Sequence, residues 1–245
     1  MMIRDTDFPD WTKELFELTG VRLTAEQERQ FAVFERELLA WNEQFNLTSI
    51  KDPRGVQVRH FLDSLSCLLA FEAGKLPKSL VDVGTGAGFP GIPLKIVLPK
   101  LKLTLVESVG KKARFCEHMV KVLNLSDVLV VAERAEDLGQ NPEHREEYET
   151  AVGRAVAAAP VLAEYLLPLV KPGGVALMPR GEAAETEAEA AVGAFRKLGG
   201  DLERVIPVVL PEVEGRRALV VVKKNARTPK LYPRKPGTPN KNPLT

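Results

Sequence analysis

Cysteine is scarce in this sequence, and long hydrophobic runs are missing. Two cysteines, Cys67 and Cys116, stand among 245 residues, which is too few for a disulfide framework. No three His, Cys, Asp or Glu residues have the spacing of a metal site, so we predict no bound metal. No apolar stretch reaches the ~18 residues of a membrane-spanning helix, and the first residues lack the basic flank of a secretory leader. These absences favour a soluble cytoplasmic protein without a membrane partner.

An excess of charge is also missing from the chain as a whole, because 34 Lys and Arg stand against 33 Asp and Glu. The balance hides an uneven distribution. Residues 1–222 carry 27 basic and 33 acidic side chains, whereas residues 223–245 carry seven basic and none acidic. The last segment, 224–245, also holds five of the 18 prolines. We therefore expect a disordered or extended basic tail that binds RNA phosphates.

The first part of the chain, residues 1–76, has the pattern of a helical region. Over residues 24–46 the apolar side chains recur three and four apart, among them Phe31 and Phe34, which predicts an amphipathic helix. Thr24 and Gln27 have the spacing of a capping box at its start. A second helix is expected over residues 56–70. The aromatic stripe could stack on nucleobases, but its helical spacing favours packing in a core.

The pattern changes in residues 77–223. Apolar runs of strand length alternate with helix-length segments, which predicts a parallel sheet covered by helices. Two further extended runs, with a short glycine-containing connection, predict a terminal hairpin. The expected fold is α/β, a seven-stranded Rossmann-like sheet with an N-terminal helical extension packed on it. The expected strands are 80–83, 103–106, 128–131, 151–152, 175–178, 202–210 and 217–222.

A glycine-rich turn, GTGAGFPG over residues 84–91, follows the first expected strand. Glycines at a strand-to-helix turn let the backbone approach a ligand closely, and the helix start offers free N–H groups. Glu107 ends the next strand, 21 residues after Gly86, where a carboxylate can accept hydrogen bonds from both ribose hydroxyls. This combination predicts a cofactor that contains a nucleoside.

Two registers of the turn compete. Gly86, Gly88 and Gly91 match the dinucleotide fingerprint, whereas Gly84, Gly86 and Gly88 after Asp82 resemble motif I of methyltransferases that use S-adenosylmethionine. The terminal hairpin favours the second register, because dinucleotide folds have six parallel strands. In that register Asp82 lies where it could hold the methionine end of the donor, directly or through water.

The residues after the fourth expected strand bear on the methyl acceptor. Enzymes that methylate exocyclic amines carry an Asn/Asp-Pro-Pro-aromatic run there, but this chain has Gly153 and Arg154. Methylation of pyrimidine C5 needs a cysteine nucleophile, and both cysteines lie in apolar helical settings. An acceptor that is already nucleophilic remains, such as guanine N7, which needs no general base. Arg154 and Arg180 suit contacts to guanine O6 or phosphate.

Five runs in one order give the chain a resemblance to the ribosomal RNA small subunit methyltransferase G family, also called glucose-inhibited division protein B. The runs are LLAWNEQFNLTSI (38–50), RHFLDSL (59–65), VDVGTGAGFPGIPL (81–94), RAEDL (134–138) and VGRAVA (152–157). The resemblance implies methyl transfer from S-adenosylmethionine, with S-adenosylhomocysteine as product, to N7 of guanine 527 in the 530 loop of 16S rRNA. It also implies a link between loss of activity and low-level streptomycin resistance. The family's donor contacts fall here on Gly84, Phe89, Glu107, Ala135, Glu136 and Arg154.

Other site predictions follow from position. His60, in RHFLDSL, is expected beside the acceptor base and is grouped with Arg154 as catalytic, although a capping or interdomain hydrogen bond is the alternative. We expect four cations to face the RNA substrate: Arg59, Arg180, Lys111 and Lys112. The expected partner is either free 16S rRNA or the small ribosomal subunit. A monomer is the default expectation. The competing functions are a methyltransferase for another RNA or a protein, and a binding module that has lost catalysis.

Overall fold

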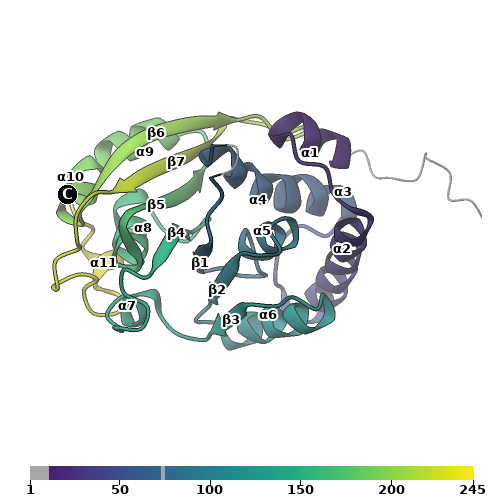
Figure 1. The fold of residues 1–245 in the computed structure, drawn as a ribbon, viewed down its shortest axis with the longest axis horizontal. Coiled ribbons are helices and arrows are strands. Elements are labelled where there is room, and N and C mark those ends of the chain that lie inside the picture. Colours follow the sequence, from purple (N-terminus) through teal and green to yellow (C-terminus); the bar gives the residue numbers. More distant parts are fainter. Residues whose placement is uncertain (1–10, 73–74) are drawn as a thin grey trace, which may run out of the picture.

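A seven-stranded sheet forms the centre of the molecule in a computed structural model, which describes residues 11–72 and 75–245 (Figure 1). The strand order is β3-β2-β1-β4-β5-β7-β6. The first five of these positions are parallel, and β7 runs antiparallel to both β5 and β6. The sequence prediction of an α/β fold with a terminal hairpin is therefore confirmed. The strands are β1 (Ser79–Val83), β2 (Lys102–Val106), β3 (Val128–Val131), β4 (Tyr148–Val152), β5 (Val170–Arg180), β6 (Gly200–Val208) and β7 (Arg217–Lys224).

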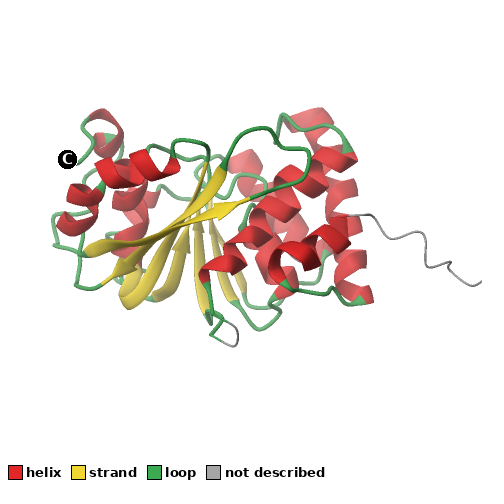
Figure 2. Ribbon diagram, turned by 90° about the horizontal axis from the view of Figure 1, so that it is seen from above, coloured by secondary structure: helices red, strands yellow, loops and turns green. Residues whose placement is uncertain are grey.

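Helices cover both faces of the sheet (Figure 2). Successive residues of a strand point to opposite faces, so Leu80 and Leu177 join one apolar cluster while Val81 and Ala176 join the other. This is why the central strands have continuous apolar runs. The helices within the sheet region are α5 (Gly91–Val97), α6 (Gly110–Val122), α7 (Ala135–Leu138), α8 (Ala159–Leu166), η3 (Leu167–Leu169), α9 (Ala184–Ala190) and α10 (Val192–Lys197).

The N-terminal helices pack on the first cluster. Thr24 caps the long helix α2 through the predicted capping box with Gln27. Phe31 and Phe34 of its aromatic stripe are buried, and Phe34 stacks on Phe89 of the glycine-rich turn with ring centroids 5.0 Å apart. Packing in the core, rather than stacking on nucleobases, is therefore confirmed for these two rings. The helices are α1 (Trp11–Thr19), α2 (Ala25–Phe45), α3 (Pro53–Val56), η1 (Gln57–Leu62), α4 (Asp63–Leu65) and η2 (Ser66–Ala70).

Some element boundaries differ from the prediction. The fourth and fifth strands are longer than expected, since both begin with residues whose polar or glycine content hides them in the sequence. The helix-length segment between β5 and β6 forms two helices, α9 and α10, which meet at Ala191. Residues 1–10, in which we predict no leader, and residues 73–74, near the expected domain boundary, lie outside the described residues. No helix of the described residues is long and apolar enough to cross a membrane.

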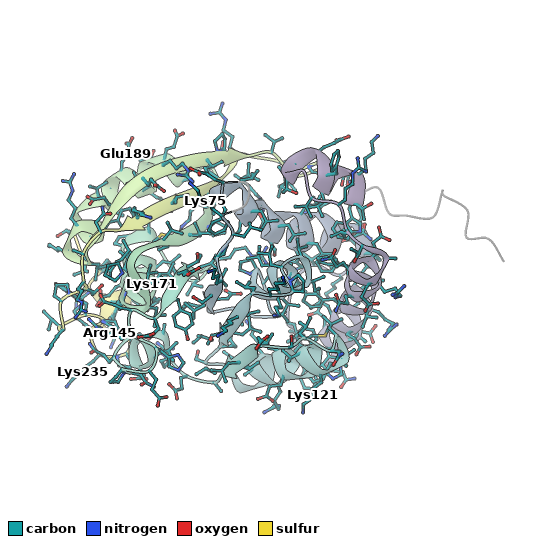
Figure 3. All side chains as sticks on the ribbon, in the orientation of Figure 1. Lys75, Lys121, Arg145, Lys171, Glu189 and Lys235 are labelled. Atoms are coloured by element: carbon teal, nitrogen blue, oxygen red, sulfur yellow. The ribbon has the colours of Figure 1, made fainter. Side chains whose placement is uncertain are left out.

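The prediction of a disordered or extended tail over residues 224–245 is wrong. Lys224 ends β7, and the residues after it fold back along α7 and α8 before the short helix α11 (Thr238–Lys241) (Figure 1, yellow). Side chains of the body bind its carbonyl groups. Arg145, labelled beside this segment in Figure 3, donates to the carbonyl oxygens of Thr228 and Tyr232 at 2.8 Å each. Remote donors, which composition does not reveal, thus hold the segment in place.

Several cations of residues 223–245 also have partners, so these residues do not carry the seven unopposed charges that the sequence indicates. Lys224 is fully buried and donates to the Leu167 carbonyl at 2.7 Å. Burial lowers the pKa of Lys224 to about 8, and Glu146, 3.3 Å away, opposes the decrease. Arg234 pairs at 2.7 Å with Glu164, a carboxylate of α8 that is fully buried.

The Arg234–Glu164 pair provides a test of this anchoring. We expect Arg234→Met to lower the free energy of unfolding by about 2 to 3 kcal/mol, because a buried carboxylate loses its cation while Arg234 itself is partly exposed. Urea unfolding of the full chain measures the change. Lys235→Met is the matched control, since Lys235 is exposed, and it should change stability by less than about 0.5 kcal/mol. Equal stability of the two variants would contradict the anchoring.

Candidate active site

The glycine-rich turn leaves the carboxyl end of β1 and is tied to β2. The backbone N–H groups of Gly84 and Thr85 both donate to the Val106 carbonyl, at 2.8 and 3.1 Å. Gly84 has a φ of +68°, and a Cβ there would lie 2.7 Å from a methyl carbon of Val156. Positive φ and close approach together require glycine at this position. Gly86 and Gly88 also have positive φ, so all three predicted glycines shape the turn.

Asp82 holds the turn through hydrogen bonds. Its side chain is fully buried, and Oδ2 accepts hydrogen bonds from Thr85 Oγ1 at 2.6 Å and from the Gly91 N–H at 2.8 Å. Burial raises the pKa of Asp82 to about 6, and the two hydrogen bonds oppose the increase. Among the described residues Oδ1 has no hydrogen-bond partner. Asp82 therefore fixes the shape of the turn, while a contact to the donor stays a prediction.

Glu107, at the end of β2, lies against the same turn. Its Oε2 accepts from the Gly86 N–H at 3.0 Å, and its Oε1 accepts from the Val109 N–H at 2.7 Å. The spacing of 21 residues in the sequence thus becomes a direct contact between carboxylate and glycine turn. Because each carboxylate oxygen has further lone pairs, Glu107 is able to accept hydrogen bonds from a ligand as well.

A pocket of about 200 Å³ opens beside the turn at the carboxyl ends of β1 and β2. This edge is where open α/β sheets bind their ligands. Ala135 and Glu136 of α7 line it, and Glu136 is 3% exposed. Their contact to the adenine end of a donor stays a prediction. The other lining residues are Val83, Gly84, Val106, Ser108, Glu133, Arg134, Val156, Ala157, Tyr165 and Asn240.

A second cluster joins the N-terminal helices to the sheet. Arg154, in the loop after β4, donates from Nη1 to Asp63 Oδ2 at 2.6 Å and to the Arg59 carbonyl at 3.2 Å. Its Nη2 lies 3.2 Å from His60 Nδ1. His60 stacks on Phe89 with ring centroids 4.4 Å apart and planes at 8°. The structure therefore brings together His60, Phe89 and Arg154, three residues singled out in the sequence.

The hydrogen bonds of His60 define its proton state. The guanidinium of Arg154 is only a donor, so Nδ1 of His60 accepts and carries no proton. Nε2 then carries the proton and donates to Thr48 Oγ1 at 2.8 Å. Burial, together with the charge of Arg154, lowers the pKa of His60 to about 3. His60 is neutral at physiological pH, with both ring nitrogens engaged.

The predicted RNA contacts are spread around this edge. Arg59 is exposed on η1, next to His60. Lys111 and Lys112 are half-buried at the start of α6, just after Glu107. Arg180, at the end of β5, is 11% exposed and lies 3.9 Å from Glu187. Its guanidinium is therefore less accessible than that of an arginine that binds a phosphate at the surface. RNA binding by these four residues stays a prediction.

Sequence reasoning did not assign a role to several residues of the site. Asp63 is one, although its position three residues after His60 places both on one helical face. Arg217 of β7 adds a second cation 3.5 Å from Asp63. Thr48, Tyr165 and Asn240 carried no local signal, because only the folded chain brings them to the site. In the described part of the chain, no group of three or more His, Cys, Asp or Glu side chains could hold a metal ion.

Solved structures with this fold include methyltransferases. A 16S rRNA (adenine(1408)-N(1))-methyltransferase from Catenulisporales acidiphilia matches with a TM-score of 0.51 and 14% identity, over 62% of this chain and 87% of that chain. The antibiotic-resistance methyltransferase Kmr matches with a TM-score of 0.50 and 18% identity, over 62% and 88%. At such low identity these matches show a shared fold.

Curated relatives are far more similar. Proteins named ribosomal RNA small subunit methyltransferase G are 52% identical in Roseiflexus castenholzii, over 92% of this chain and 95% of the relative, and 43% identical in Staphylococcus aureus, over 96% and 98%. The second alignment spans 235 of 245 residues, so it extends into the 22-residue C-terminal segment that lies outside the five matching runs. The family model of rRNA small subunit methyltransferase G matches residues 27–213. The chain therefore belongs to the rRNA small subunit methyltransferase G family.

Proposed function

We propose that this chain transfers a methyl group from S-adenosylmethionine to N7 of guanine 527 in the 530 loop of 16S rRNA. Family membership and the methyltransferase fold support the donor and the rRNA substrate. One observation carries the choice of N7. His60, the histidine of the cluster, has both ring nitrogens engaged, and Asp63, the acid beside Arg154, is paired with two arginines, so neither is free to act as a general base.

The residues of the pocket and of the glycine turn beside it fit the donor. The backbone of Gly84 and the Ala135–Glu136 pair would hold the adenosine, and Glu107 would accept hydrogen bonds from the ribose hydroxyls. When bound, S-adenosylmethionine supplies an electrophilic methyl group on a sulfonium. Phe89, held between Phe34 and His60, would exclude water from the reacting side of the turn. Asp82 acts as a positioning residue that keeps the glycines in place.

The side chains around the turn that could remove a proton are held by other residues or buried. This arrangement fits a methyl acceptor that has no proton to lose. Asp63 is paired with Arg154 and Arg217, Glu107 holds the turn, and Asp82 is buried beneath it. His60 is neutral, but both of its ring nitrogens are used. Guanine N7 has an in-plane lone pair and no proton at neutral pH, so placing it against the methyl group is sufficient. Such positioning contributes up to roughly 7 to 11 kcal/mol.

The cysteines disfavour the alternative of pyrimidine C5 methylation. That reaction needs a thiolate nucleophile. Cys67 and Cys116 are both fully buried, and burial raises the pKa of each thiol well above its usual range. Cys116 also donates weakly to the Gly86 carbonyl at 3.5 Å. Each thiol therefore acts as a core residue.

Arg154 has donors left for the substrate. Three of its five N–H groups bind Asp63, the Arg59 carbonyl and His60. In the part of the chain that the structure describes, the Nε–H and one Nη2–H have no partner. These two would donate to guanine O6 or to a phosphate, which leaves N7 free to react. His60 orients the guanidinium and is thus a positioning residue.

Mapping of the modified nucleotide tests the function. The protein is incubated with radiolabelled donor and with 16S rRNA or small subunits from cells that lack the enzyme. We expect chain cleavage specific for N7-methylguanine at position 527. Label on an exocyclic amine, or at another nucleotide, would overturn the proposal. Calorimetry with S-adenosylmethionine checks the first step, since a chain without donor affinity would be a binding module.

Arg154→Lys tests the role of the guanidinium fork. Lysine keeps the cation beside buried Asp63 but loses the second donor direction, so we expect kcat to fall about 100-fold, as for a misplaced substrate. Single-turnover methylation measures the loss, and circular dichroism checks the fold. Arg196→Lys is the matched control, because Arg196 is 71% exposed in a surface pair, and its kcat should not change. Full activity of Arg154→Lys would refute the assigned role.

The neutral state of His60 is open to titration. Nitrogen-detected NMR of the imidazole should show Nε2 protonated and no titration between about pH 5 and 8, because its folded pKa is lowered to about 3. The unfolded chain binds a proton there below about pH 6.5. The contribution of His60 to the free energy of unfolding therefore rises with pH between about 3 and 6.5. Titration of folded His60 near pH 6.5 would show that it is a free base.

A further inference from the structure

The C-terminal segment, residues 224–245, reaches the donor pocket. We propose that it forms a wall of that pocket, and that Asn240 in α11 is a specificity-determining residue that hydrogen-bonds the adenine edge of the donor. The inference rests on the proposed function for the identity of the donor. It assigns the segment to donor recognition, whereas its basic composition had indicated RNA binding.

The segment is bound to the pocket wall itself. The N–H of Gly237, the residue before α11, donates to Glu136 Oε1 at 2.9 Å. Glu136 lines the pocket and is almost fully buried. A hydrogen bond at this place sets the start of α11 directly against α7. Asn240 follows within the same short helix and lines the same pocket.

A second anchor fixes the segment from α8. The backbone N–H of Arg234 and its guanidinium both bind buried Glu164, at distances from 2.7 to 3.3 Å. Tyr165, the next residue of α8, lines the pocket. Arg234 Nη2 also donates to the Asn242 carbonyl at 2.8 Å, which holds the end of α11. Asn240 thus lies between two fixed points of the backbone, while its side chain is exposed and able to meet a ligand.

The chemistry of the wall selects a base edge over a phosphate. Two carboxylates, those of Glu133 and Glu136, line the pocket together with Asn240 and one cation, Arg134. Arg134 lies 3.6 Å from Glu136 and offsets one of the two charges, so a net negative charge remains that would repel an anion. A carboxamide offers one acceptor and a two-hydrogen donor. Adenine presents an amino donor next to a ring-nitrogen acceptor, so asparagine pairs with it through two hydrogen bonds. This complementarity makes Asn240 a reader of adenine.

Calorimetry with two product analogues tests the assignment. S-adenosylhomocysteine carries the amino group, and S-inosylhomocysteine carries a carbonyl in its place. We expect the wild-type chain to prefer the adenosyl compound by about tenfold or more, in line with a paired base contact. Asn240→Ala should weaken adenosyl binding about tenfold and reduce the preference to about twofold. A preference unchanged in Asn240→Ala would overturn the proposal.

Two further variants complete the test. Asn242→Ala is the matched control, because Asn242 is exposed and lies two residues on, but is not among the lining residues. It should bind both compounds as the wild type does. A chain that ends at Gly237 keeps both anchors and should lose the preference as Asn240→Ala does. Equal weakening of both ligands in Asn240→Ala would mean structural support without recognition, and would also overturn the assignment.

The result separates this inference from the function on which it rests. Methylation at a site other than guanine N7 would refute the proposed acceptor and leave the preference for adenosyl intact. A wild-type chain with no affinity for S-adenosylhomocysteine would refute the proposed donor, and with it the inference. Donor affinity with normal methylation, but without any adenosyl preference, would refute the role of Asn240 alone.

Discussion

The buried ion pair between Arg154 and Asp63 is the constraint on which the site depends. Taking both charges out of water is costly, and their attraction offsets that cost only when the geometry is good. The 2.6 Å contact therefore fixes the loop after β4 against the N-terminal helices. His60 of η1 stacks on Phe89 of the glycine turn and contacts Arg154, so all three parts meet there. The helical region is thus a component of the site, and one apolar cluster extends continuously from α1 to the sheet.

Most of the fold could be predicted from local sequence patterns. The capping box at Thr24, the strand lengths around the glycine turn and the terminal hairpin follow from neighbouring residues, so the sequence was sufficient to predict them. The same holds for Glu107, whose spacing from Gly86 reflects one strand–helix–strand unit. Contacts such as His60 with Thr48 were not predictable, because only tertiary packing brings those residues together.

The C-terminal segment shows why composition alone misleads. Proline lacks an N–H group and lysine is seldom buried in proteins, and a segment rich in both has the composition of a disordered chain. What keeps it ordered are donors and carboxylates from elsewhere, namely Arg145, Glu146 and Glu164. The charge asymmetry between body and tail is real, but in the folded protein part of it becomes internal pairing. Net charge per segment therefore does not measure the charge that a partner would meet.

The strand order also determines when each strand can pair during synthesis. Since β7 lies between β5 and β6, the ribosome has already made both of its neighbours when Arg217 emerges. Until then β5 has a free edge and β6 has no partner in the sheet, a condition that promotes association between chains. Insertion of β7 pairs both at once, and the residues that fold over α8 follow it. A nascent chain of this protein therefore completes its sheet only after Lys224 has been made, and the pocket wall that contains Asn240 forms after the sheet.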